Sequence, residues 1–125
     1  MPDDALHSPK ARPYRADAER SYVLPPSYYI DPAVYEREKR DIFYKAWNYA
    51  AHVSQLANVG DYVTCRVADQ ELFVIRGKDE RLRAFYNVCP HRAHQLLKDC
   101  GSSRVITCPY HAWSFHADGR LRTAR

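Results

Sequence analysis

The sequence predicts a mainly β protein in which one α-helix precedes an antiparallel β meander. Between Asp31 and Trp47 the apolar residues repeat at about 3.6 residues, which is the period of a helix with one apolar face. Beyond Trp47, short runs rich in β-branched and aromatic residues alternate with turn compositions. The chain has 125 residues, of which 46% are hydrophobic and 27% charged, so it has the composition of one small globular domain.

The N-terminal part divides into two segments. Residues 1–21 are polar, proline-containing and without periodicity, so we expect a mobile lead. In 22–47, Pro25-Pro26 favours an extended stretch. Asp31-Pro32 then supplies an N-cap side chain followed by proline at the first helical position, so a helix is predicted from there to about Trp47.

Residues 48–125 are predicted to form the β domain. A final hairpin is expected in WSFHADGRLR, around Asp118-Gly119, because this pair favours a tight turn. We interpret KDCGSSR, which contains Cys100, as a turn. The expected strands lie in WNYAAHV (47–53), DYVTCRV (61–67), ELFVIRG (71–77), LRAFYNV (82–88) and RVITC (104–108).

The net charge of +4 is unevenly distributed, with a balance of −2 over 1–75 and +6 over 76–125. The basic residues of the second half are scattered through turns and strands, which does not favour nucleic-acid binding. They form either a solvated face or a docking surface for an acidic protein partner. We expect no membrane span and no signal peptide, hence a cytoplasmic protein with reduced thiols.

Two short segments carry the candidate metal ligands. Cys89-Pro90-His91 and Cys108-Pro109-Tyr110-His111 each offer one thiolate and one imidazole, and sixteen residues separate them. One tetrahedral zinc ion is an alternative, although zinc sites usually pair cysteine with cysteine and histidine with histidine in sequence. Mixed segments suit a two-iron cluster better, with one cysteine from each on the first iron and one histidine from each on the second.

The paired motif resembles the Rieske signature. CPHRAHQLL and CPYHAWSFHADGRL, with DPAVYEREKRDIFYKAW, NVGDYVTCRV and LRAFYNVCPHR before them, resemble the N-terminal part of the large (alpha) subunit of Rieske non-haem iron oxygenases, the family of aromatic-ring-hydroxylating dioxygenases. HAW at 111–113 resembles the branch that oxidises quaternary amines such as carnitine. The resemblance implies a Rieske-type antiparallel β sandwich and a [2Fe-2S] cluster, with Cys89 and Cys108 on one iron and His91 and His111 on the other.

The resemblance also implies a place in a larger enzyme. Family oxygenases hold a mononuclear non-haem Fe(II) in a C-terminal catalytic domain, and no such iron site can be assigned in this sequence. We therefore expect an N-terminal fragment with a Rieske domain incomplete at its C-terminus and no catalytic residue of its own. It would take electrons from a reductase or ferredoxin and pass them to that iron, next to the catalytic domain and neighbouring subunits. A free-standing Rieske ferredoxin and a zinc-stabilised interaction module are the alternatives.

The other cysteines and histidines have simpler interpretations. Cys65 lies on a predicted strand, and we expect its side chain to be buried in the core. We expect Cys100 to have no role in the metal site. We expect surface or edge positions for His7, His52, His94 and His116. In respiratory Rieske proteins a disulfide joins the ligand segments; the corresponding positions here are His94 and Tyr110, so no disulfide is expected. Arg92 either holds its segment, faces a partner or is a plain surface residue.

Two alanines depart from the family pattern. Ala93 and Ala112 stand where glycine is commoner. Because alanine favours φ < 0, these positions require either an altered loop or some backbone strain. Trp113 and Phe115 stand where respiratory Rieske proteins carry hydroxyls next to the cluster, so we expect a potential at the low end of the Rieske range.

Overall fold

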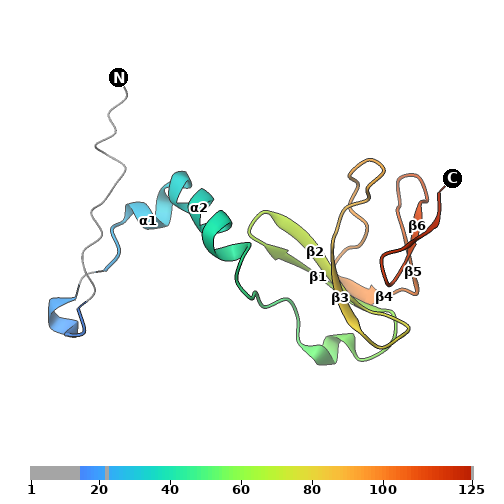
Figure 1. Ribbon diagram of the computed structural model, residues 1–125, viewed down its shortest axis with the longest axis horizontal. Helices are drawn as coiled ribbons and strands as arrows, with labels where there is room; N and C mark the ends of the chain where they lie inside the picture. Colours follow the sequence, from blue (N-terminus) through green and yellow to red (C-terminus); the bar gives the residue numbers. More distant parts are fainter. Residues whose placement is uncertain (1–14, 22, 125) are drawn as a thin grey trace, which may run out of the picture. The chain divides into compact units, whose positions relative to one another are not determined.

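The computed structural model describes residues 15–21 and 23–124, and the chain divides into two compact units between Ala46 and Trp47 (Figure 1). His7 and most of the predicted lead lie outside the described residues. Within 15–21, Ala18–Arg20 forms one 3-10 turn, which the Asp17 side chain caps by accepting from the Glu19 N–H at 3.1 Å.

The first unit contains the predicted helix. α2 (Pro32–Glu38) begins as expected, because the Asp31 side chain accepts a hydrogen bond from the Ala33 N–H at 2.8 Å. The helix continues as a π-helical segment, Lys39–Phe43, and ends before Trp47. The extended stretch predicted around Pro25-Pro26 is wrong at its end, where α1 (Ser27–Ile30) follows at once. Pro26 has φ −52° and ψ −31°, which already suit a helical turn.

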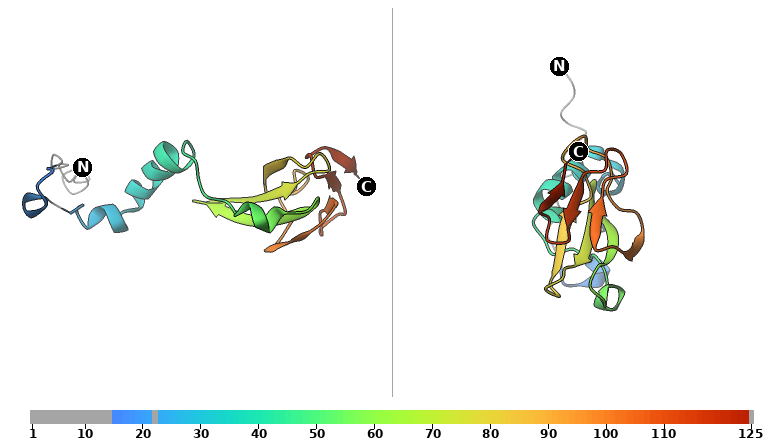
Figure 2. Two further views of the ribbon diagram at one scale, coloured as in Figure 1. Left: turned by 90° about the horizontal axis from the view of Figure 1, so that it is seen from below. Right: turned by 90° about the vertical axis from the view of Figure 1, so that its right-hand side faces the viewer.

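The second unit holds two antiparallel sheets, which Figure 2 shows from two further directions. The four-stranded sheet has the order β3-β2-β1-β4, and the three-stranded sheet the order β5-β6-β7. The predicted mainly β class, the meander and the Asp118-Gly119 hairpin are confirmed. The strands are β1 (Asp61–Val67), β2 (Gln70–Arg76), β3 (Leu82–Tyr86), β4 (Cys100–Ser102), β5 (Val105–Thr107), β6 (Ser114–His116) and β7 (Leu121–Thr123).

Two strand predictions are wrong. WNYAAHV forms no strand: it leads into a 3-10 helix, Val53–Leu56, whose N-terminus is closed by a capping box. The His52 ring accepts from the Ser54 N–H, and the Gln55 side chain accepts from the His52 N–H. Such local side-chain to backbone hydrogen bonds compete with sheet pairing. Conversely, Cys100–Ser102 is a strand and not a turn, because it pairs with β1, with Gly101 opposite Tyr62. Small residues fit there, since a Cβ on Gly101 would lie 2.9 Å from the Tyr62 Oη.

The core of the second unit lies between the candidate ligand segments and the sheets. Phe73 and Ile75 of β2 pack in one cluster with Ile106, Phe115, Cys89 and Cys108. Cys65 is only half-buried on β1, so its predicted core position is wrong, and Cys100 is exposed. Among the residues the structure describes, no helix is long and apolar enough to cross a membrane.

Asn87 ties the chain on both sides of the first candidate segment. Its buried side chain donates to the Leu97 carbonyl at 2.7 Å and accepts from the N–H groups of Leu96 and Leu97 at 3.2 and 2.9 Å. Its own N–H donates to the Glu71 carbonyl at 2.8 Å. The loop between β3 and β4 is therefore anchored at its start to a point ten residues further on.

Asn87→Ala should lower the free energy of unfolding by about 2–4 kcal/mol, because it removes three side-chain hydrogen bonds at a buried site. Urea unfolding of the purified protein measures the change. Gln95→Ala, an exposed substitution in the same loop, is the matched control and should change the value by less than about 0.5 kcal/mol. Equal losses in the two variants would show that Asn87 does not anchor the loop.

Candidate metal centre

The two candidate segments adopt the same backbone turn. In the first loop (89–94) the Cys89 N–H donates to the His94 carbonyl at 2.8 Å, and the Ala93 N–H donates to the Cys89 carbonyl at 2.8 Å. In the second loop (108–113) the equivalent bonds, Cys108 to Trp113 and Ala112 to Cys108, measure 2.8 and 3.0 Å. The loops lie side by side at one end of the sheets (Figure 1). The chain therefore repeats one turn to build both halves of the site.

Each turn requires a left-handed residue four positions after its cysteine. Ala93 has φ +52° and Ala112 has φ +57°. The alanines thus keep the turn and accept the strain, which is one of the two outcomes the sequence allows. A left-handed alanine costs roughly 1–2 kcal/mol, so the hydrogen bonds of the turn and the packing around it must offset this.

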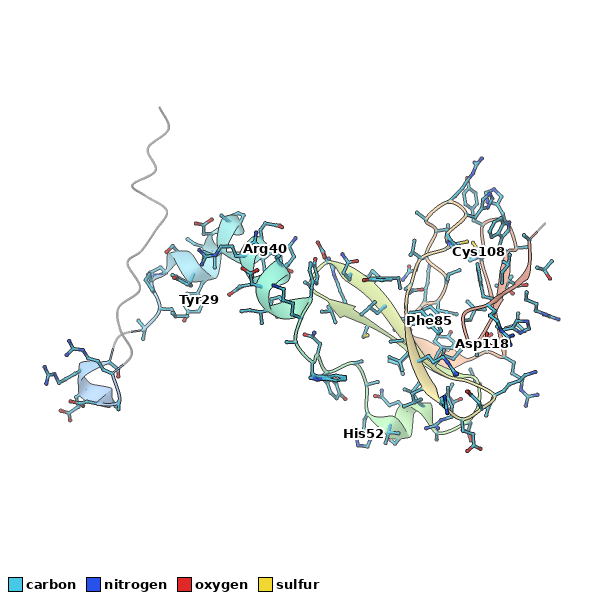
Figure 3. All side chains as sticks on the ribbon, viewed as in Figure 1. Tyr29, Arg40, His52, Phe85, Cys108 and Asp118 are labelled. Atoms are coloured by element: carbon cyan, nitrogen blue, oxygen red, sulfur yellow. The ribbon has the colours of Figure 1, made fainter. Side chains whose placement is uncertain are left out.

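The two thiols are the buried part of the site. Cys89 is 1% exposed and Cys108 2%, and their side chains lie within hydrogen-bonding contact of each other. Figure 3 labels Cys108 near the base of the two loops. Burial raises the pKa of Cys89, and the adjacent Cys108 raises it further. Burial opposes ionisation of Cys108 as well, but the Tyr110 and His111 N–H groups and the Cys89 thiol lower the pKa of Cys108 overall. These contacts make Cys108 easier to deprotonate than an ordinary thiol, and a bound cation would favour the thiolate on both cysteines.

The two imidazoles form the outer part of the site. The ring centroids of His91 and His111 lie 4.8 Å apart at an interplanar angle of 62°. His91 is exposed and His111 half-buried. Burial, helped by the neighbouring histidines and by the charge of Arg92, lowers the pKa of His111, which favours the neutral form of this ring. A neutral imidazole is the form that ligates a metal.

The Nδ1 atom of His111 is buried without a hydrogen-bond partner. A buried polar atom that the protein leaves unsatisfied normally has a partner that is a bound group or water. The donor set therefore fits a metal centre at this place.

In space, the candidate ligands pair like with like. The sequence joins one cysteine to one histidine in each loop, whereas the fold brings thiol to thiol in the core and imidazole to imidazole at the surface. Across residues 15–21 and 23–124, no three His, Cys, Asp or Glu side chains converge as they would around one ion. Two separate pairs fit a two-iron cluster better than one tetrahedral zinc.

Aromatic contacts join the loops crosswise. The ring of His91 stacks on Trp113 with centroids 4.7 Å apart and planes within 3°, and His94 lies 5.7 Å from Tyr110. In both contacts the residue two positions after one cysteine meets the residue five positions after the other. His94 and Tyr110 occupy the positions that correspond to the disulfide of respiratory Rieske proteins. In this chain the two side chains are in ring contact.

The remaining candidates lie apart from this site or on its rim. Arg92 and His94 are exposed within the first loop, and His52 is exposed at the cap of a 3-10 helix. The prediction for His116 is wrong, because this residue is half-buried on β6, the central strand of its sheet. The sequence analysis missed that Asn87 anchors the first loop. Its position in LRAFYNVCPHR could have indicated this role, since an amide side chain at the end of an apolar strand often hydrogen-bonds to the backbone.

Comparison with known proteins bears on the whole of the second unit. The model of the Rieske [2Fe-2S] domain family matches residues 46–125. Among curated relatives, the carnitine monooxygenase oxygenase subunit of Escherichia coli (strain K12) is 49% identical over 111 residues, covering 88% of this chain. The glycine betaine monooxygenase oxygenase subunit of Chromohalobacter salexigens is 36% identical over 124 residues, covering 95%.

Solved structures agree in fold. The quaternary ammonium Rieske monooxygenase CntA, in complex with gamma-butyrobetaine, superposes with a TM-score of 0.78 at 52% identity over 82% of this chain. Naphthalene 1,2-dioxygenase from Rhodococcus sp. gives a TM-score of 0.76 at 31% identity, also over 82%. The predicted Rieske-type fold is thereby confirmed. The chain spans 30% of the length of the Escherichia coli relative and 30% of that CntA chain.

Ala112→Gly should raise the free energy of unfolding by about 0.5–1 kcal/mol, because glycine adopts the left-handed conformation without a Cβ clash. Thermal or urea unfolding measures it. Ala84→Gly on β3 is the matched control and should lower the same quantity by about 0.5–1 kcal/mol, since glycine weakens a strand. A loss of stability in both variants would contradict the strain at Ala112.

Proposed function

Because the chain belongs to the Rieske [2Fe-2S] domain family, we propose that Cys89 and Cys108 hold one iron of its [2Fe-2S] cluster and His91 and His111 hold the other. The observation that carries this assignment is the pairing of like side chains. The buried thiols are in contact, and the imidazole rings lie 4.8 Å apart. When bound, such a cluster takes up and releases one electron at a time.

The protein's own residues would set how easily that electron is accepted. Two neutral imidazoles in place of two thiolates leave the site less negative, which favours reduction. The core around Cys89 and Cys108 excludes water, whereas His91 is exposed. The exposed imidazole edge is therefore the shorter route for an electron between the site and another protein.

The relatives support a proposal about the larger protein in which this electron transfer takes place. We propose that the chain acts as the Rieske part of an oxygenase subunit of the amine-oxidising kind, because its relatives include subunits named for carnitine and glycine betaine. In this setting a reductase or ferredoxin supplies electrons. A mononuclear iron in a catalytic domain, reached within one subunit or across to a neighbouring one, receives them. The cytoplasm, where these thiols stay reduced, is the proposed location.

Spectroscopy of anaerobically purified protein tests the assignment. We expect visible absorption, two irons and two sulfides per chain, and an EPR signal after reduction that hyperfine measurements assign to nitrogen ligands. A colourless protein with one zinc per chain would establish the zinc-stabilised module instead. If the chain forms a reducible cluster that passes electrons to no oxygenase domain, the free-standing ferredoxin is the correct alternative.

His91→Cys and His111→Cys should each lower the reduction potential of the assembled protein by on the order of 100 mV, because each adds a negative charge at the iron. Redox titration followed by EPR measures the shift. His94→Asn, a nearby exposed histidine without a proposed ligand role, should leave the potential in place. An unchanged potential in both cysteine variants would remove the two histidines from the ligand set.

A further inference from the structure

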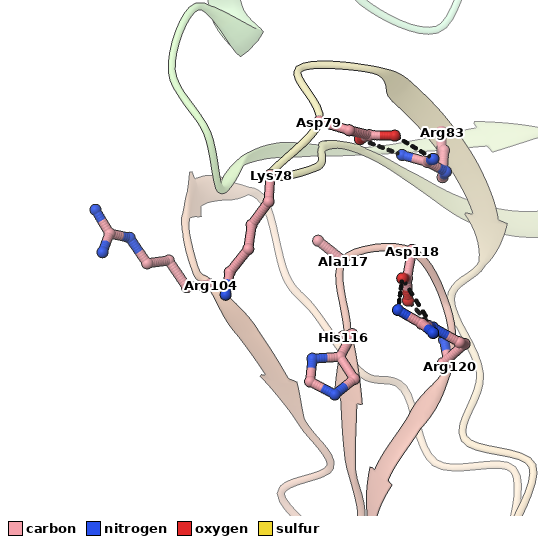
Figure 4. A pocket seen from close by; sticks show the side chains of 8 residues that line it. All are labelled: Lys78, Asp79, Arg83, Arg104, His116, Ala117, Asp118 and Arg120. Atoms are coloured by element: carbon pink, nitrogen blue, oxygen red, sulfur yellow. Dashed lines mark hydrogen bonds and ion pairs between the residues drawn. The ribbon is translucent and has the colours of Figure 1, made fainter.

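Away from the candidate metal centre, the β unit has a pocket that shares no residue with the two loops. It has a volume of about 310 Å³ and lies between the turns that join β2 to β3 and β6 to β7, with the loop before β5 on one side (Figure 4). The hollow is bordered by Lys78, Asp79, Arg83, Arg104, His116, Ala117, Asp118 and Arg120. Its volume is at the small end of the range for small-molecule sites, roughly 300–1,000 Å³.

Both acidic side chains of this pocket are already neutralised within its wall. Arg83 donates two hydrogen bonds to the Asp79 carboxylate, at 2.8 and 2.7 Å, and Arg120 contacts the Asp118 carboxylate at 2.8 and 2.9 Å (Figure 4). Arg83 holds the pKa of Asp79 well below its usual range, and Arg120 lowers the pKa of Asp118. Both carboxylates are therefore ionised and engaged with an arginine each.

The remaining basic residues leave the pocket positive. Within the part of the chain that the structure describes, the side chains of Lys78, Arg104 and His116 form no hydrogen bond or ion pair. Four Lys or Arg residues against two Asp residues give the lining a formal charge of +2 with His116 neutral. Like charges gathered around a hollow repel one another, and an anion inside it would relieve that repulsion.

The backbone of the two turns is fixed by close packing. Gly77 permits the Asp79–Arg83 pair, because a Cβ there would lie 2.7 Å from the Asp79 Oδ1 and 2.8 Å from the Arg83 Nη1. Gly119, with φ +90°, packs against the Phe85 ring, which a Cβ would approach to 2.7 Å. The walls are thus preformed, whereas the exposed side chains of Lys78 and Arg104 are free to turn toward a ligand.

We propose that this pocket binds a small organic dianion, carrying two carboxylate groups or a phosphate group, with Lys78 and Arg104 as the main charged contacts. The formal charge of +2 matches a dianion, and a volume of about 310 Å³ suits a small molecule more than a protein segment. Arg83 and Arg120 keep their own carboxylates and line the pocket as paired groups. His116 lines the base of the same hollow (Figure 4).

Isothermal titration calorimetry of the cluster-loaded protein tests the proposal, with succinate, a dicarboxylate dianion, as the probe at constant ionic strength. We expect saturable binding of one succinate per chain. The double variant Lys78→Gln/Arg104→Gln should raise the Kd by about tenfold or more, since it removes two charge-assisted contacts. Both residues are exposed, so folding should be intact, and circular dichroism verifies it.

The matched control is Lys98→Gln/Arg122→Gln, which removes the same charge from the basic half without touching the pocket lining. Its Kd for succinate should stay within about twofold of the parent, because exposed charges outside the lining are screened. Equal weakening in the two double variants, or no saturable binding, would overturn the site. Saturation by a short peptide of aspartates but not by succinate would overturn the small-molecule ligand and point to an acidic protein segment instead.

Discussion

The contact between two buried thiols is the constraint on which the rest of the β unit depends. Burial beside Cys108 raises the pKa of Cys89, and a thiolate pair in an apolar core is costly without a cation to offset it. The fold accepts this arrangement because the same two cysteines belong to the hydrophobic cluster built on Phe73, Ile75, Ile106 and Phe115. Packing and ligation are thus not separable here: the atoms that would bind iron also fill the core.

The repeated turn explains how unlike segments deliver like pairs. Both loops share two hydrogen bonds of the same register, yet the histidine stands two residues after Cys89 and three residues after Cys108. The crosswise ring contacts show that the loops face each other about an approximate twofold relation. The one-residue offset breaks that relation and brings His111 beside His91. Each loop carries one cysteine and one histidine in the sequence, and the fold therefore places cysteine beside cysteine and histidine beside histidine.

Much of this could be predicted because the signals are local. Asp31-Pro32 begins a helix by its own capping chemistry, and Asp118-Gly119 forms its hairpin by its own turn preference. The four candidate ligands were found from residue type and spacing alone. The run from Trp47 fails as a strand for a local reason, the capping box between His52 and Gln55. The other failures have non-local causes: Cys100–Ser102 becomes a strand only because β1 offers it an edge. The extent to which Cys65 is buried likewise depends on what the rest of the chain places over β1.

The left-handed alanines have a consequence for how such a site tolerates change. At φ near +55° every L side chain is disfavoured by contact with its own backbone and a β-branched one most of all, so Ala93 and Ala112 restrict substitution in these turns. A β-branched residue at either position would shift the backbone that carries a neighbouring candidate ligand. Two residues outside the candidate ligand set therefore limit which sequences can keep the four candidate side chains in register.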